Sequence, residues 1–188
     1  MKIYNVEMMS MYWKSVGAIH TEKTVELALR KAEEYGIKSI VVASVSGKTA
    51  ELFAGKAENV VCVTHVNGFK DPGVNELTPQ QREILIGKNV KVLTTNHVLS
   101  GAERGISKKF GGVYPVEVMA STLRMFGQGV KVSVEVAVMA LDAGFIPYGE
   151  EVIAIGGTGK GVDTAVVIRP DYSANILNTY IAEIICKP

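Results

Sequence analysis

The sequence predicts an α/β protein whose strands are mostly parallel. Helical and strand-like patterns alternate along residues 21–95, and this order joins parallel strands through right-handed crossovers. Near the C-terminus, two apolar strands are separated only by the glycine-rich segment 156–161, which is too short for a crossover, so the second should run antiparallel to the first. The length of 188 residues, with 47% hydrophobic and 21% charged residues, is typical of one globular domain, residues 1–188.

The composition argues against several classes of partner. A net charge of +1 gives no electrostatic drive towards nucleic acid or an anionic membrane. The N-terminus lacks the apolar core of a signal peptide, and the most apolar long segment, 130–146, carries charged residues and is not expected to span lipid. Two cysteines, Cys62 and Cys186, are too few for a disulfide framework or a zinc cluster, so we expect no metal site and a reducing, cytoplasmic location.

Residues 1–20 have no clean period and predict an N-terminal arm that packs on the domain or on a second copy, which would make a homo-oligomer. Its apolar side chains are Met8, Met9, Met11, Tyr12 and Trp13. A helix should follow over residues 21–35, with Thr21 capping its start and Gly36 ending it.

The central elements are predicted from short apolar runs and turn residues. Strands are expected at 40–43, 60–64 and 90–95, with helices at 48–54 and 78–87. Thr78 and Pro79 fit the start of the second of these helices. Residues 100–112 are predicted to form a polar loop of a length that is usually functional.

The C-terminal third is predicted from its helix and strand patterns. Pro115 opens a helix that ends near Phe126. The segment 130–143 alternates like a strand, but Lys131, Glu135 and Asp142 share one helical face, so a helix is favoured. Strands are expected at 151–155 and 164–168, and residues 180–186 should form an edge strand.

The turn at residues 44–50 is the strongest local signal for a ligand. A strand that passes through a short loop with Gly47 into a helix leaves backbone N–H groups free to hold a phosphate. Ser46, Lys48 and Thr49 add hydroxyl groups and a charge. The alternative is an ordinary turn in which serine caps the helix. A nucleotide-binding P-loop is excluded because Val42 stands where that motif needs glycine.

Four strands should bring polar residues to one edge of the sheet, where open parallel sheets bind ligands. The glycines of 156–161 could approach a ligand closely, with Asp163 orienting the turn, or could simply form a β-hairpin. Phe69 could stack on a planar ring or cover the core. His65 and His97 could be acid/base groups or ordinary strand-end histidines, and we rank binding above catalysis.

These motifs resemble the C-terminal α/β domain of pyruvate kinase, in which a helix and strand lead to a Ser-Gly-x-Thr-Ala loop, here residues 46–50. The chain is closer still to stand-alone archaeal and bacterial proteins of that fold. The motifs that carry this likeness are His65-Val-Asn-Gly-Phe69, Ser100-Gly-Ala-Glu-Arg104, Lys109-Phe-Gly-Gly112, Arg124-Met-Phe-Gly-Gln-Gly129 and Gly156-Gly-Thr-Gly-Lys-Gly-Val-Asp-Thr-Ala165.

The resemblance implies a three-layer αβα sandwich with a mostly parallel mixed sheet and an antiparallel edge. It also implies a phosphate role for residues 46–49, and flavin mononucleotide (FMN) or a similar phosphorylated small molecule as ligand. It does not imply pyruvate kinase activity, because the catalytic barrel of that enzyme, of about 250 residues, is longer than this chain.

The sequence leaves three functions open: a binding protein or flavoprotein, an enzyme on a phosphorylated metabolite with His97 or His65 as acid/base, and a regulatory, effector-sensing module. The predicted ligand contacts are Ser44, Ser46, Gly47, Lys48, Thr49, Ala50, Thr64, Gly68, Phe69, His97, Gly127, Gln128, Gly156, Gly157, Thr158, Gly159, Asp163 and Thr164.

Overall fold

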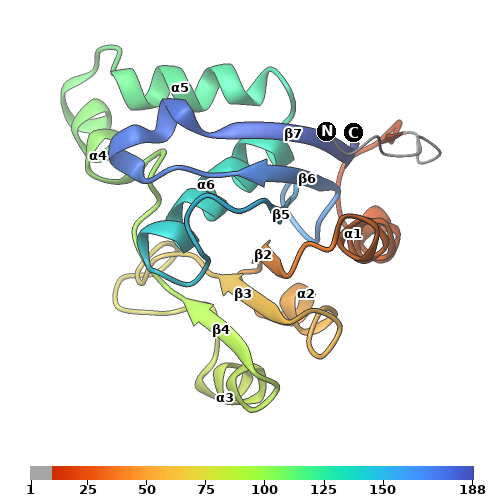
Figure 1. Ribbon diagram of the computed structural model, residues 1–188. Helices are drawn as coiled ribbons and strands as arrows, with labels where there is room; N and C mark the ends of the chain where they lie inside the picture. The colour runs from red at the N-terminus through yellow and green to blue at the C-terminus, as the bar shows by residue number, and fades with distance from the viewer. Residues whose placement is uncertain (1–9) are drawn as a thin grey trace.

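The computed structural model describes residues 10–188, which form one seven-stranded sheet with helices on both faces (Figure 1). Its strand order is β1-β7-β6-β5-β2-β3-β4. The strands are β1 (Met11–Tyr12), β2 (Ser39–Ala43), β3 (Asn59–Val63), β4 (Val90–Leu93), β5 (Val152–Gly156), β6 (Thr164–Arg169) and β7 (Tyr180–Lys187). Strands β5, β2, β3 and β4 are mutually parallel, whereas β6 is antiparallel to β5 and β7. The predicted mixed, mostly parallel sheet is confirmed.

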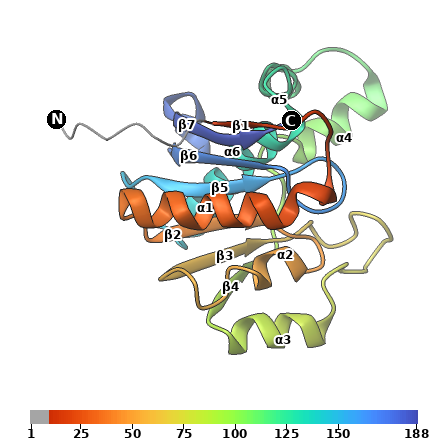
Figure 2. The same ribbon diagram turned by 90° about the vertical axis from the view of Figure 1, so that its right-hand side faces the viewer.

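Within residues 10–188, six α-helices accompany the sheet: α1 (Thr21–Tyr35), α2 (Lys48–Glu51), α3 (Pro79–Gly87), α4 (Gly101–Phe110), α5 (Pro115–Arg124) and α6 (Gln128–Asp142). Two 3₁₀ turns, η1 (Ala18–His20) and η2 (Ser173–Asn178), complete the described structure. Helix α1 lies in front of the sheet in Figure 2, and α6 lies behind it. Alternate residues of β2 enter different cores: Ile40 and Val42 pack with α1, α2 and α3, while Val41 packs with α6. The arrangement is the expected three-layer sandwich.

The helix ends confirm some of the expected caps and correct one. Gly36 adopts the left-handed conformation, with φ 65°, and ends α1. The Thr78 hydroxyl accepts the Gln81 N–H and caps α3. Thr21, however, does not cap α1. Its hydroxyl bonds the backbone of Val162, because η1 runs directly into α1 and places Thr21 inside the helix.

Three further boundaries differ from the sequence prediction. The expected polar loop at 100–112 is mostly helix, α4. Two contacts hold α4 against α5: the Arg104–Glu117 ion pair, and a hydrogen bond from the Glu117 backbone N–H to the carboxylate of Glu103. Helix α2 ends at Glu51 rather than near residue 54. Strand β7 is not the edge of the sheet, because the two-residue strand β1 pairs with its outer side.

The described part of the N-terminal arm packs on its own domain. Met11 and Tyr12 form β1, and the Trp13 indole N–H donates to the Asp163 carbonyl at 2.7 Å. The ring of Trp13 also stacks on that of His20, with 4.6 Å between centroids. Met8 and Met9 lie outside the described residues. Across residues 10–188, every helix is too short or too polar to cross a lipid bilayer.

Candidate functional site

The parallel strands β2, β3, β4 and β5 end at a common edge, so the turns that follow them lie together, as predicted. Backbone and side-chain bonds join the strand ends directly. The Ser44 N–H donates to the Val63 carbonyl, and the Thr64 N–H donates to the Leu93 carbonyl, each at 2.9 Å. The Thr64 hydroxyl also bonds Thr94 at 2.7 Å. The turns after β2, β3 and β4 therefore start from strand ends that are hydrogen-bonded to one another.

The first of these turns, residues 44–50, divides into a buried structural part and an exposed part. Ser44 is buried, and its hydroxyl accepts the Ala50 N–H of α2 at 3.3 Å, although the N-cap position of this helix belongs to Gly47. Gly47 has φ 81° and lies against α3. Ser46 and Lys48 are exposed and Thr49 is half-buried. Within residues 10–188, the side chains of these three residues make no hydrogen bond or ion pair, so they remain open to a ligand.

An aromatic cluster formed by His65, Phe69 and His97 lies beyond the ends of β3 and β4. The His65 and Phe69 ring centroids are 3.9 Å apart, and the His97 ring is 5.5 Å from His65 and 5.6 Å from Phe69. Phe69 is 54% exposed, although burying a phenyl ring would be favourable. Of the alternatives left open by the sequence, covering the core is therefore the weaker one for Phe69.

His65 has a partner that the sequence analysis missed. Its Nδ1 lies 2.6 Å from a carboxylate oxygen of Glu76. The connection between β3 and α3 folds back to make this contact, with the Gly68 N–H donating to Val74 and Asn75 donating to Asn67. Eleven positions separate the two residues, and no periodic pattern marks the pair in the sequence.

The imidazole of His97 is partly buried. Burial lowers the pKa of its imidazole, and the nearby ammonium of Lys131 and the ring of His65 lower it further. The carboxylate of Glu135 and a backbone hydrogen bond with Thr64 oppose this change in pKa but do not outweigh it. The neutral imidazole is therefore favoured at His97.

Behind His97 lies a buried ion pair on α6, formed by Lys131 and Glu135 and called here the α6 ion pair. Nζ and Oε2 are 2.5 Å apart, and each residue is only 5% exposed. The second oxygen of Glu135 accepts the Leu99 N–H at 3.0 Å. The side of α6 that carries Lys131 and Glu135 therefore lies against the connection that contains His97. The hydrogen bond from Leu99 to Glu135 holds this connection to the helix.

The glycine-rich segment 156–161 is shaped largely by close packing. A side chain at Gly156 would lie 2.3 Å from the Gly129 carbonyl, and one at Gly157 would lie 2.6 Å from the Gly161 carbonyl. Gly161 in turn lies against Ala18 and Thr21. Gly159 is different, because nothing lies within 4 Å of a side chain there. Packing thus accounts for most of these glycines, and ligand contact stays a prediction.

Asp163 orients this turn, as expected from the sequence. It is fully buried, and its carboxylate accepts the N–H groups of Gly17 and Thr158 and the hydroxyl of Thr164. Thr164 is also fully buried. Their direct contact with a ligand stays a prediction, and the hydrogen bonds of their side chains within residues 10–188 are internal to the protein.

The predicted contacts Gly127 and Gln128 form the start of α6, close to the end of β5. Gly127 has φ 113° and offers no side-chain cap to the helix. The Gln128 amide oxygen accepts a hydrogen bond from the Nε–H of Arg124 at 2.9 Å. Gly129, the next residue, packs against Thr164. The first turn of α6 therefore belongs to the same edge as the turns after β2 and β5.

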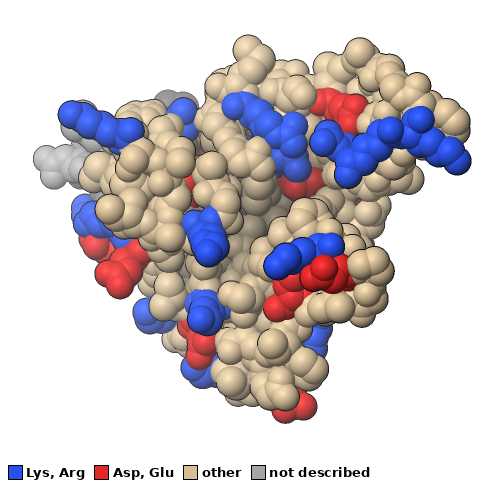
Figure 3. All heavy atoms as spheres, turned by 180° about the vertical axis from the view of Figure 1, so that it is seen from behind, with Lys and Arg blue, Asp and Glu red and all other residues tan. Residues whose placement is uncertain are grey.

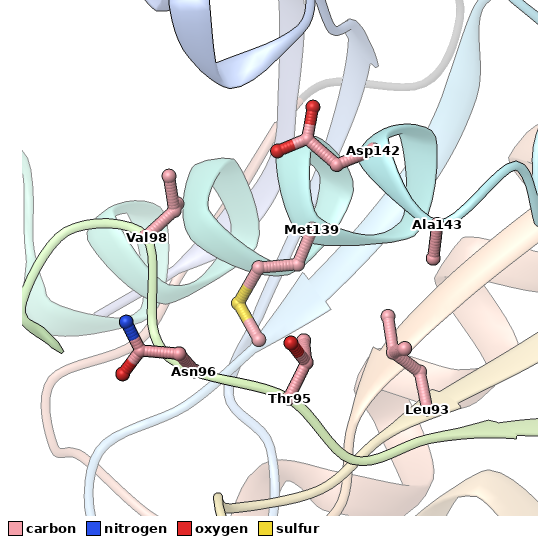
Figure 4. Close-up of a pocket in the computed structure, with 7 residues that line it drawn as sticks. All are labelled: Leu93, Thr95, Asn96, Val98, Met139, Asp142 and Ala143. Atoms are coloured by element: carbon pink, nitrogen blue, oxygen red, sulfur yellow. The ribbon is translucent and has the colours of Figure 1, made fainter.

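A pocket of about 310 Å³ lies behind the connection that carries His97 (Figure 4). In Figure 4, Met139 of α6 points towards Thr95 and Asn96. Asn96 and Val98 line this pocket. The ring of His97, which lies between them in the sequence, instead contacts the rings of His65 and Phe69. The remaining lining residues are Leu93, Asp142 and Ala143.

The outer surface near this edge is uneven and partly basic. Viewed from behind, the molecule is hollowed beside the region of α4 and α5, where Lys and Arg side chains gather (Figure 3). Helix α4 contributes Arg104, Lys108 and Lys109, all exposed. An anionic ligand would meet favourable charge on this side.

Both cysteines, Cys62 and Cys186, are buried. Burial raises the pKa of the Cys62 thiol to about 12, so it is not a nucleophile near neutral pH. Residues 10–188 contain no group of three or more His, Cys, Asp or Glu side chains placed to share a metal ion.

Comparison with known families identifies the fold. Residues 22–168 match the family described as pyruvate kinase, alpha/beta domain. The match spans α1 to β6 and so includes the four parallel strands, the turns at their carboxyl ends and the antiparallel strand. The chain belongs to the pyruvate kinase alpha/beta domain family.

Proposed function

We propose that this protein binds a phosphorylated small molecule with a planar ring, with FMN as the first candidate, at the carboxyl edge of its sheet. The observation that carries the proposal is the exposed ring of Phe69, in an aromatic cluster at the same edge as a turn with unused hydroxyl and ammonium groups. The ring would stack on Phe69, and the phosphate would lie at Ser46, Lys48 and Thr49.

The spacing of the strands supports this arrangement. The phosphate-binding turn follows β2, while the aromatic cluster follows β3 and β4, and neighbouring strands are about 4.8 Å apart. The strand ends from which the two groups start are thus one or two strand spacings apart, and the ribityl chain of FMN would connect them. Asp163 does not oppose an anion there, because its carboxylate already accepts two backbone N–H groups.

The first experiment is the visible absorption spectrum of the purified protein, with mass spectrometry of any compound that heat denaturation releases. A flavin spectrum with the mass of FMN supports the proposal. If the protein is purified without flavin, FMN is titrated into it and the quenching of flavin fluorescence gives the affinity.

Variants then separate the phosphate contact from the ring contact. Charge-assisted hydrogen bonds are worth about 1.5–3 kcal/mol, so Lys48→Ala should weaken FMN binding roughly tenfold to a hundredfold. Riboflavin, which lacks the phosphate, should be unaffected by this change, whereas Phe69→Ala should weaken both ligands. Lys56→Ala, an exposed lysine beyond α2, is the matched control. Equal FMN affinity in the Lys48→Ala and control proteins would refute the phosphate assignment.

A second candidate function, an enzyme that acts on a phosphorylated metabolite, is favoured by the contact between His65 and Glu76. A carboxylate that fixes an imidazole is a common arrangement for acid/base catalysis. Turnover with a near-neutral pH dependence that disappears in His65→Gln would support this function over binding alone.

A further inference from the structure

The pocket behind the connection from β4 to α4 is separate from the proposed phosphate and ring contacts (Figure 4). One wall is the C-terminal end of α6, with Met139, Asp142 and Ala143, and the other is the end of β4 with the connection that follows it. Its volume of about 310 Å³ is at the lower end of the range for small-molecule sites. The pocket is therefore large enough for a small ligand of its own.

The lining combines apolar side chains with polar groups that have no internal partner. Leu93, Val98 and Met139 belong to the hydrophobic core cluster that packs on α6. The side chains of Thr95 and Asn96 make no hydrogen bond within residues 10–188. A ligand with an aliphatic body and a polar head would match both parts of this lining.

Asp142 gives the pocket a negative charge. One of its carboxylate oxygens accepts the Ser173 N–H at 3.0 Å, and the carboxylate forms no ion pair within the described residues, 10–188. The closest lysine in sequence on the facing strand, Lys91 of β4, donates to the Phe145 carbonyl at 3.1 Å instead. Asp142 is also the last residue of α6, where the helix dipole adds a partial negative charge. Both features favour a cation beside this carboxylate.

We propose that this pocket binds a small organic cation, a primary ammonium group on a short aliphatic chain. The three N–H donors of the ammonium would meet the Asp142 carboxylate and the side-chain oxygens of Thr95 and Asn96. The chain would lie against Met139. A bare metal ion fits less well, because Asp142 alone is charged among the described residues that line the pocket. The inference does not depend on the proposed function, whose ligand has the opposite charge.

The test uses the full chain with ¹³C-labelled methionine methyl groups. The chain has seven methionines, and the Met139 signal is identified by its loss in Met139→Leu. The probes are butylammonium, 1-butanol and butyrate, which are similar in size and differ in the charge of the head group. They are titrated near neutral pH at one ionic strength. The Met139 signal should shift saturably with butylammonium, more weakly with 1-butanol, and not with butyrate.

Variants separate the charge from the space. Asp142→Asn keeps an oxygen for the Ser173 N–H but removes the charge, so it should weaken butylammonium binding by about two- to fivefold and leave 1-butanol binding unchanged. Glu83→Gln, which removes an exposed carboxylate from α3, is the matched control. Ala143→Leu, at an exposed position of the lining, should weaken both probes because the larger side chain fills the pocket.

A preference for butylammonium that is lost in Asp142→Asn and kept in Glu83→Gln supports the proposal. Equal binding of butylammonium and 1-butanol to wild type would mean that the pocket does not select a cation, and the inference would be wrong. The inference also fails if the Met139 signal does not respond to butylammonium, or if Asp142→Asn or Ala143→Leu leaves butylammonium binding unchanged. The FMN titration is independent of these results.

Discussion

Breaking the α6 ion pair should destabilise the fold strongly. Lys131→Met leaves the Glu135 carboxylate 5% exposed, with the Leu99 N–H as its remaining described partner. Removing one member of a buried pair costs about 3–5 kcal/mol, which lowers the folded-to-unfolded ratio roughly 150-fold or more. Urea denaturation measures this loss. Lys23→Met is the matched control, because Lys23 pairs with Glu26 on an exposed helix face and should cost less than about 1 kcal/mol.

Variants of the two members of the α6 ion pair should move the pKa of His97 in opposite directions, which loss of packing alone does not explain. Lys131 lowers this pKa and Glu135 raises it. Lys131→Met should therefore raise the pKa of His97, and Glu135→Gln should lower it, in a histidine NMR titration. The double variant Lys131→Met/Glu135→Met should cost less than Lys131→Met alone, since no unpaired charge remains. A loss below about 1 kcal/mol in Lys131→Met, or pKa shifts of the same sign, would refute the reasoning.

Two further changes test local features of the edge. The pKa of His97 is lower in the folded chain than its unfolded value of about 6.5, so the unfolded chain binds more protons and stability should fall as the pH falls below about 6.5. His97→Gln should lose less stability than wild type between about pH 7.5 and pH 5 in urea denaturation, and an identical loss would contradict this. Gly47→Ala should cost about 1–3 kcal/mol more than Gly55→Ala. Both glycines have positive φ, but a side chain at Gly47 lies 2.9 Å from Leu77 and Leu85, and one at Gly55 meets nothing within 4 Å. Equal denaturation midpoints would rule out that steric cost.

Most helices and strands were predictable because the local spacing of apolar residues indicates them. The apolar run of β2 and the helical spacing of α1 each specify an element without knowledge of the rest of the chain. Helix α4 was missed because Gly101 and Gly105 weaken its propensity and none of its residues is buried. Its contacts with α5, notably between Arg104 and Glu117, come from tertiary structure.

The candidate site was predictable as an edge but not as a set of contacts. Parallel strands bring their carboxyl ends together whatever their side chains, so the grouping of His65, Phe69 and His97 followed from strand order. The partner of His65 did not, because Glu76 returns through an irregular loop. Glu135 lay on a predicted helix face, but it also accepts the Leu99 N–H from a distant part of the chain, a contact that helical periodicity does not describe.

Three carboxylates near this edge are held by hydrogen-bond donors, while the ammonium group of Lys48 remains available. Asp163 accepts two backbone N–H groups, Glu76 accepts His65, and Glu135 is paired with Lys131. Lys48, on the turn after β2, is exposed and has no ion pair within residues 10–188. A carboxylate already bound by donors repels an incoming anion less than a free one, because its charge is shared with those donors. An anionic group would therefore be attracted by the local charge of Lys48 rather than by the net charge of the protein, which is only +1.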